Sequence, residues 1–102
     1  MRIEPINAVM KPEWLALRVA LWPDEAANLA GDLDRMLTDC VAANFIARDA
    51  GGTAIGFIEA MVRHDYVNGC ETSPVAFVEG LFVTEPHRRQ GVAQALVARV
   101  VA

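Results

Sequence analysis

The sequence is poor in the features that mark several classes of protein. Its 102 residues include only two cysteines, Cys40 and Cys70, which lack the Cys-x-x-Cys spacing, so a disulfide framework is not expected. No apolar run is long enough to cross a bilayer, and the first residues, Met1–Pro5, lack the apolar core of a signal peptide. These absences predict a cytoplasmic protein with no membrane partner.

Two kinds of catalytic motif are also missing. His64 and His87 do not stand at metal-ligand spacing from each other or from the cysteines, so no metal cofactor is expected. The sequence contains no Gly-x-Ser-x-Gly motif, which argues against a covalent enzyme intermediate. If the chain catalyses transfer of a group, direct transfer between two bound substrates is therefore expected.

Charge is distributed unevenly along the chain. The formal net charge is -4 and the pI is about 5.0, which disfavours nucleic acid as a partner. All 13 acidic residues precede Arg88, so the last 15 residues carry only positive charge. An acidic body followed by a basic segment suits a polyamine substrate and an anionic cofactor, although an acidic net charge is also ordinary in globular proteins.

The apolar periodicity and the turn signals predict one α/β domain. With 54% hydrophobic and 22% charged residues, a chain of 102 residues can form one core at most. The predicted order is β-α-α-β-β-β-α: a strand over 2–6, a helix between Pro12 and Pro23, a helix capped by Asp24, strands over 44–48, 53–62 and 75–83, and a helix over 94–100.

The segment Arg88–Ala93 joins the last predicted strand to the last predicted helix. Backbone N–H groups at the start of a helix have no intrahelical acceptor, and the helix dipole adds partial positive charge there. Gly91 allows a ligand to approach the backbone closely, and the side chains of Arg88 and Arg89 suit phosphate oxygens. The segment therefore predicts a site for a phosphate or pyrophosphate group.

The pattern Arg88-x-x-Gly91-x-Ala93 resembles the (Gln/Arg)-x-x-Gly-x-(Gly/Ala) motif of the GNAT superfamily of acetyl-CoA-dependent N-acyltransferases. The chain is similar, within that superfamily, to the aminoglycoside 6'-N-acetyltransferases from near its N-terminus to its last residue. The matching segments are Leu21–Pro23, Tyr66–Gly69, Thr72–Phe77 and Glu79–Gly80. The resemblance implies a mixed, mostly antiparallel sheet flanked by helices, and a homodimer.

The resemblance also implies further elements after the last helix: a strand, a helix and a final strand pair. In the family these elements form the other wall of the active site and often supply a tyrosine as general acid. This chain stops at Val101-Ala102 with no helix cap. Residues 1–102 are therefore expected to be the N-terminal part of a single GNAT domain.

The resemblance assigns the cofactor contacts to one continuous stretch. Backbone groups of the strand would pair with the pantetheine arm of acetyl-CoA, and Gly80 would mark a bulge that splays this strand. The backbone contacts would come from Leu81, Phe82 and Val83, and the pyrophosphate cradle from Arg88, Arg89, Gln90, Gly91, Val92 and Ala93.

Glu79 is the candidate for binding the substrate ammonium and accepting its proton. It interrupts an apolar strand, where a buried charge needs a partner or a task; the alternative is a salt-bridged or edge-exposed glutamate. Trp22 and Tyr66 would line an aminosugar cleft, unless they serve in packing as is expected of Trp14. Glu59 alternates with apolar residues and is expected to face solvent, the alternative being added negative charge in the cleft.

The expected function is transfer of acetyl from acetyl-CoA to the 6'-amine of an aminoglycoside, by direct transfer in a ternary complex, as in antibiotic resistance. One alternative is an acetyltransferase for another small polyamine or for a peptide amine. The other is a non-catalytic module that binds CoA or takes part in an assembly.

Overall fold

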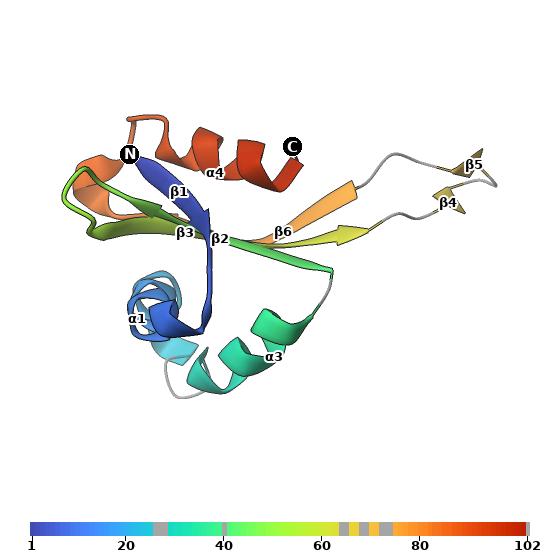
Figure 1. The fold of residues 1–102 in the computed structure, drawn as a ribbon, viewed down its shortest axis with the longest axis horizontal. Helices are drawn as coiled ribbons and strands as arrows, with labels where there is room; N and C mark the ends of the chain where they lie inside the picture. Colours follow the sequence, from blue (N-terminus) through green and yellow to red (C-terminus); the bar gives the residue numbers. More distant parts are fainter. Residues whose placement is uncertain (26–28, 40, 64–65, 68–69, 72–74, 102) are drawn as a thin grey trace.

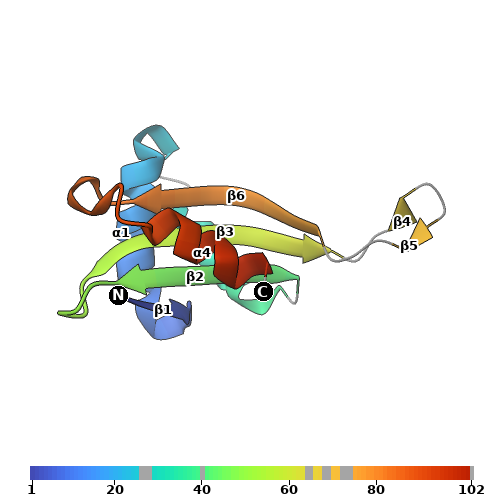
Figure 2. The same cartoon turned by 90° about the horizontal axis from the view of Figure 1, so that it is seen from above.

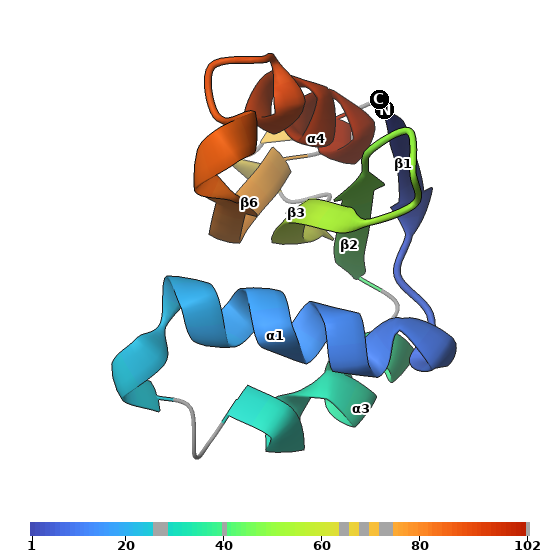
Figure 3. The same ribbon diagram turned by 90° about the vertical axis from the view of Figure 1, so that its left-hand side faces the viewer.

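The computed structural model describes residues 1–25, 29–39, 41–63, 66–67, 70–71 and 75–101. A central sheet separates two helical layers, with α4 (Val92–Val101) on one face and both α1 (Lys11–Leu21) and α3 (Leu33–Thr38) on the other (Figures 1 and 3). The chain has the mixed α/β fold that the sequence predicts.

The sheet has four strands in the order β1-β2-β3-β6, and every neighbouring pair is antiparallel. A separate small hairpin interrupts the connection from β3 to β6 and projects beyond the sheet (Figure 1). The strands are β1 (Arg2–Pro5), β2 (Ala42–Arg48), β3 (Ala54–Arg63) and β6 (Val75–Val83), and the hairpin consists of β4 (Tyr66–Val67) and β5 (Cys70–Glu71).

Each helical layer covers its own apolar core. Seen from above, α4 crosses β2, β3 and β6 (Figure 2), and Leu96 and Val92 of α4 pack with Ile58 and Ala60 of β3. On the opposite face Trp14, Leu17, Ile46 and Phe57 join α1 to the sheet. Because both faces of β3 are covered, its sequence is almost continuously apolar, as is typical of a buried central strand.

The first helix follows its sequence signals closely, and the second predicted helix is described in part. Proline stands in the first turn of α1, and the helix ends at Leu21 before Trp22 and Pro23, as predicted. Within the second predicted helix and just before it, the structure describes the 3₁₀ turns η2 (Pro23–Glu25) and η3 (Ala30–Asp32) and the α-helix α3. Asp24 lies within η2, and the N-cap position of α3 is Asp32; residues 26–28, which directly follow η2, lie outside the described part of the chain.

A buried arginine ties the start of the chain to the sheet. The guanidinium of Arg48 donates two hydrogen bonds to the Glu13 carboxylate, at 2.6 and 2.8 Å, and others to Glu4 and to the Gly52 carbonyl. Arg48 holds the pKa of Glu13 below its ordinary value, because the hydrogen bonds favour the ionised carboxylate. This network fixes α1 against β1 and the β2–β3 turn.

We predict that Gly56→Ala destabilises the fold. A Cβ atom at Gly56 would lie 2.8 Å from the Phe82 carbonyl oxygen, and this backbone atom of β6 cannot yield without disturbing the strand pair. The expected loss in unfolding free energy is about 1–3 kcal/mol by urea denaturation. Gly31→Ala, where a new Cβ meets nothing within 4 Å, is the control and should leave stability unchanged or raised. Equal stabilities for the two variants would contradict the packing argument.

Candidate active site

The edge strand β6 connects two recesses in the molecule. One recess lies beside the middle of β6 and contains Glu79, and the other begins at Val83, where β6 ends, and continues to the start of α4. In the described part of the chain no strand pairs with the outer side of β6, so the backbone groups of Leu81, Phe82 and Val83 border an open edge. At a rise of about 3.3 Å per residue, the strand from Glu79 to Val83 covers roughly 13 Å.

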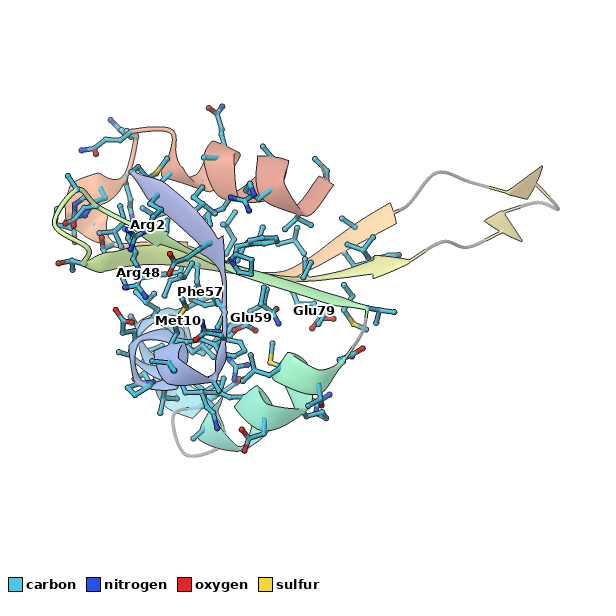
Figure 4. The ribbon with its side chains drawn as sticks, viewed as in Figure 1. Arg2, Met10, Arg48, Phe57, Glu59 and Glu79 are labelled. Carbon is cyan, nitrogen blue, oxygen red and sulfur yellow. The ribbon has the colours of Figure 1, made fainter. Side chains whose placement is uncertain are left out.

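A β-bulge determines where Glu79 points. Glu59 of β3 pairs with Gly80 and the next residue, Ala60, pairs with Val78, so Glu79 is an extra residue on β6. A bulge of this kind places two successive side chains on one face of a strand pair. Glu79 therefore lies on the same face as Glu59, toward α1 and α3 (Figure 4).

Gly80 completes the bulge, as expected from the sequence, and also allows a close packing contact. A Cβ atom at this position would lie 2.6 Å from Cη2 of Trp22, so only glycine lets the indole approach the strand. The indole packs edge-on against Phe57, with ring centroids 6.4 Å apart, and lies 5.4 Å from the guanidinium carbon of Arg18. Trp22 thus packs behind the bulged strand, and it is not among the residues that line the recess beside Glu79.

A buried ion pair lies directly beside the bulge. Nε of Arg18 is 2.8 Å from Oε2 of Glu59, and both side chains are more than nine-tenths buried. Oε2 also accepts a 2.9 Å hydrogen bond from the Trp14 indole N–H, and Arg18 donates from Nη1 to the Leu29 carbonyl at 2.6 Å. The Arg18 Nε–H is not directed at the carboxylate, so its contact is an ion pair without a well-aligned hydrogen bond.

The environment of Glu59 perturbs its titration. Burial raises the pKa of this carboxyl above its ordinary value, and the Arg18 charge and the Trp14 hydrogen bond act in the opposite direction. The nearby charge of Glu79 raises the pKa of Glu59 further. The expectation that Glu59 faces solvent was wrong, because α1 covers this face of β3.

Glu79, in contrast, is exposed, and the expectation of a buried charge on β6 was wrong. Its strand is the outermost of the sheet, so a charge there remains hydrated. The side chain still lines a recess of about 130 Å³ whose wall carries four carboxylates and two arginines. Both arginines are engaged within the wall: Arg18 with Glu59, and Arg35 with Asp32 at 3.3 Å.

The surplus of acceptors in this acidic recess favours a cationic guest. Asp39 and Glu79 form no ion pair within the described part of the chain. The buried Oδ1 of Asn44 also accepts no hydrogen bond from any described residue. An ammonium group carries three donors and one positive charge, which is the complement of this lining. Sequence reasoning did not find Arg18, Asp39 or Asn44, because their meeting depends on how α1 and α3 pack on the sheet.

The second recess, which we call the anion recess, has a volume of about 440 Å³ and lies between the end of β6 and the start of α4. Its backbone turns through left-handed conformations at Arg89, with φ 65°, and at Gly91, with φ 81°. The Ala95 N–H donates to the Gly91 carbonyl at 3.0 Å, so the preceding amides lie in the unpaired first turn of α4. A Cβ at Gly91 would meet nothing within 4 Å, which leaves the backbone approachable from that side.

The side chains of this loop divide into supporting and lining groups. Arg88 donates from Nε to the Val83 carbonyl at 2.8 Å and lies over the Phe82 ring, so it holds the loop against the end of β6. Gln90 donates to the Pro86 carbonyl at 3.3 Å, and it is absent from the lining of the recess. The lining consists of Val83, His87, Arg88, Arg89, Gly91, Val92, Ala93 and Gln94, so it includes every residue predicted from the loop motif except Gln90.

Some of the sequence expectations concern parts of the chain that the structure describes only partly. The backbone of Tyr66 belongs to β4, but the placement of its side chain lies outside the described residues. Trp14 is fully buried, as predicted for a core residue.

The described residues contain no metal-binding group of three or more His, Cys, Asp or Glu side chains, and no helix among them is long and apolar enough to span a membrane.

The chain is similar to known acetyltransferases in sequence. Residues 8–102 match the Acetyltransferase (GNAT) family. The chain is 47% identical over 102 residues to an aminoglycoside N(6')-acetyltransferase type 1 of Salmonella typhimurium, covering 98% of this chain and 69% of the relative. It is 41% identical over 100 residues to the type 1 enzyme of Acinetobacter baumannii, covering 98% and 68%. The chain thus spans about two thirds of the length of these relatives.

Solved structures show the same similarity. The apo structure of aminoglycoside 6'-N-acetyltransferase AAC(6')-IG from Acinetobacter haemolyticus superposes with a TM-score of 0.82 at 39% identity, covering 98% of this chain and 68% of that one. AAC(6')-Iy in complex with the bisubstrate analogue CoA-S-monomethyl-acetylneamine superposes with a TM-score of 0.83 at 43% identity, covering 97% and 67%. The strands and helices described above therefore recur in proteins of the same type.

Proposed function

The chain belongs to the GNAT family of acetyltransferases, and from this premise we propose that it transfers acetyl from acetyl-CoA to the 6'-amine of an aminoglycoside. The observation that carries the proposal is the alignment of an anion site and a cation site along one open strand edge. The anion site suits the cofactor, and the acidic recess suits a polyamine acceptor. The relatives that act at the 6' position support this choice of acceptor.

The loop before α4 fits the diphosphate of acetyl-CoA. The open space at Gly91, the positive φ angles and the unpaired amides of the first helical turn form a cradle of N–H donors. Arg89 adds a full positive charge, and Arg88 adds another while it anchors the loop to β6. Acetyl-CoA supplies the thioester whose acetyl group is transferred.

The strand between the two recesses would direct the cofactor toward the acceptor. Those backbone groups of the segment Leu81–Val83 that point away from β3 can pair with the amide groups of pantetheine as an added strand would. Such pairing would run the arm along the roughly 13 Å from the loop to the bulge. The reactive end would then reach the level of Glu79, where the two substrates meet.

Glu79 has the position required of a general base. An ammonium group in the acidic recess would be held by carboxylates and would lose one proton to Glu79, directly or through a water molecule. The neutral amine then uses its freed electron pair to attack the thioester carbonyl carbon. The C–S bond would break and the thiolate would depart with its electron pair. The acceptor nitrogen would lose its second proton to this thiolate, directly or through water, so that CoA leaves as the thiol and the nitrogen becomes a neutral amide carrying the acetyl group. Holding both reactants at one strand supplies much of the rate advantage.

Glu59 would contribute charge and shape to the recess without accepting the substrate proton. Its carboxylate is committed to Arg18 and Trp14, and its side chain is 3% exposed. Trp22 would support the bulge from behind, and Tyr66 remains a predicted wall of the aminosugar cleft. A homodimer, a cytoplasmic location and a role in antibiotic resistance remain predictions of the same kind.

The class of acceptor can be tested by comparing three amines. Thiol release from acetyl-CoA should be fastest with an aminoglycoside that has a 6'-amine, and much slower with a linear polyamine or an N-terminal peptide amine at equal concentration. Preference for the linear polyamine or the peptide would replace the aminoglycoside assignment and keep the transferase. Binding of acetyl-CoA without thiol release from any acceptor would favour the CoA-binding module.

We predict that Gly91→Val weakens CoA binding by about tenfold or more. The new side chain would occupy the open approach to the backbone and would strain a residue whose φ is 81°. Titration calorimetry with CoA measures the effect. The matched control is Gly52→Val in the remote β2–β3 turn, where φ is 90° and a new Cβ also meets nothing. Similar CoA affinities in the two variants would contradict the assignment of the cradle.

A further inference from the structure

His87 is a polar residue of the anion recess to which the sequence motif assigns no role. It ends the 3₁₀ turn η4 (Glu85–His87), between β6 and the basic loop, and its half-buried ring lines the recess. Nδ1 of the ring lies 2.9 Å from the hydroxyl oxygen of Thr84. The His87 N–H also donates to the Thr84 carbonyl at 2.9 Å, so both side chain and backbone are held by the same residue.

The contact with Thr84 determines what the ring can offer to a ligand. With Nδ1 engaged, Nε2 is the remaining polar atom of the imidazole. An imidazolium carries protons on both nitrogens, so it can donate to the Thr84 hydroxyl and to an anion at the same time. Thr84 makes no side-chain cap to the backbone of η4, which leaves its hydroxyl for the ring.

The charges around the ring favour an anionic guest. The recess presents Arg88 and Arg89, and the α4 residues in its wall, Val92, Ala93 and Gln94, are uncharged. The charged neighbour of opposite sign on η4 is Glu85, which is exposed and does not line the recess. A protonated His87 would therefore be a third cation beside Arg88 and Arg89, and no carboxylate in the wall of the recess would compete with a phosphate group for it.

We propose that His87 is a phosphate ligand for CoA, and that Thr84 is the positioning residue that orients its ring. The proposal rests on the CoA site proposed above and adds a residue that strengthens binding as the pH falls. Imidazole is the ordinary side chain whose charge changes between pH 5 and 8, whereas arginine stays charged throughout. CoA affinity should then contain a pH-dependent part that depends on His87.

Calorimetric titration with dephospho-CoA at pH 6 and pH 8 tests the proposal. This ligand keeps the diphosphate and lacks the 3'-phosphate. A phosphate monoester itself gains a proton at about pH 6, which would weaken binding as the pH falls and so oppose the effect expected from His87. The wild-type protein should bind dephospho-CoA about three- to tenfold more tightly at pH 6 than at pH 8, which is the gain expected when a hydrogen bond becomes charge-assisted. His87→Gln keeps an N–H donor without a titrating charge and should show no pH dependence. His87→Phe keeps a planar ring but has no hydrogen-bond donor, so this variant should bind weakly at both pH values.

Variants of Thr84 separate positioning from general packing. Thr84→Ser keeps the hydroxyl and should retain the pH dependence, whereas Thr84→Val keeps the shape and should reduce it. If His87→Gln changes the pH dependence of CoA affinity but not that of dephospho-CoA affinity, the phosphate that His87 binds is the 3'-phosphate.

The outcomes separate this proposal from the function that it extends. Equal pH dependence of wild type and His87→Gln with both ligands would overturn the role of His87 and leave the CoA site intact. Failure of wild type to bind either ligand at either pH would remove the CoA site, and the role of His87 with it.

Discussion

Glu79→Gln is expected to lower kcat for acetyl transfer by about 100-fold, with CoA affinity unchanged. The amide keeps the size of the side chain at the bulge but cannot accept a proton from the bound ammonium. The CoA site begins beyond it, at the end of β6, so calorimetric binding of CoA should be the same in both proteins. Steady-state thiol release with an aminoglycoside acceptor gives kcat and KM separately.

Asp39→Asn is the matched control for this variant. It removes one negative charge from the same recess and retains the side-chain oxygen that accepts the Val41 N–H at 3.0 Å. We expect it to raise the acceptor KM severalfold through weaker attraction and to leave kcat close to wild type. Equal kcat for wild type and Glu79→Gln near neutral pH would exclude Glu79 as the base.

Arg18→Met is expected to lower the free energy of unfolding by about 3–5 kcal/mol at pH 7.5. The substitution leaves the buried carboxylate of Glu59 without its cation, next to the like charge of Glu79. The double variant Arg18→Met/Glu59→Gln removes both charges and should recover part of the loss. Arg35→Met is the control, because the Arg35 side chain is 72% exposed, and its effect should stay within about 0.5 kcal/mol.

The sign of the pH dependence follows from the direction of the Glu59 shift. Burial raises the pKa of Glu59 in the folded state, so the folded protein binds this proton more tightly than the unfolded chain does. The contribution of Glu59 to the free energy of unfolding therefore becomes more favourable as the pH falls through its raised pKa. Without Arg18 the pKa of Glu59 should be raised further. The loss in unfolding free energy caused by Arg18→Met, measured by urea denaturation, should therefore be smaller at pH 5 than at pH 7.5. A deficit that grows toward pH 5 would contradict a buried, unpaired carboxylate.

The outline of the fold could be predicted from the sequence because its elements carry local signals. Proline in the first turn and Pro23 after the end define α1, and nearly continuous apolar runs mark the long strands β3 and β6. The anion loop could also be predicted, since it needs only a strand, a glycine and a helix in succession. The 3₁₀ turns η2 and η3 could not, because the same apolar residues suit a 3₁₀ turn and an α-helix.

The carboxylates could not be placed correctly from the sequence, and the reason is the bulge. Alternation assigns a face to every strand residue, but one extra residue at Glu79 changes the face of everything before it. Glu59 is buried because α1 covers its face of β3, and only the packing of Trp14 and Arg18 shows this. Gly80 was the local signal for the bulge.

The most direct test of the account is thiol release from acetyl-CoA with two matched aminoglycosides, one with a 6'-amine and one with a 6'-hydroxyl. The account predicts release with the amine, with the product acetylated at that nitrogen, and none above background with the hydroxyl. Equal release with both acceptors would contradict transfer to the 6'-amine. Release with neither, from protein that binds CoA, would contradict the claim that the two recesses along β6 form one reaction centre in this chain.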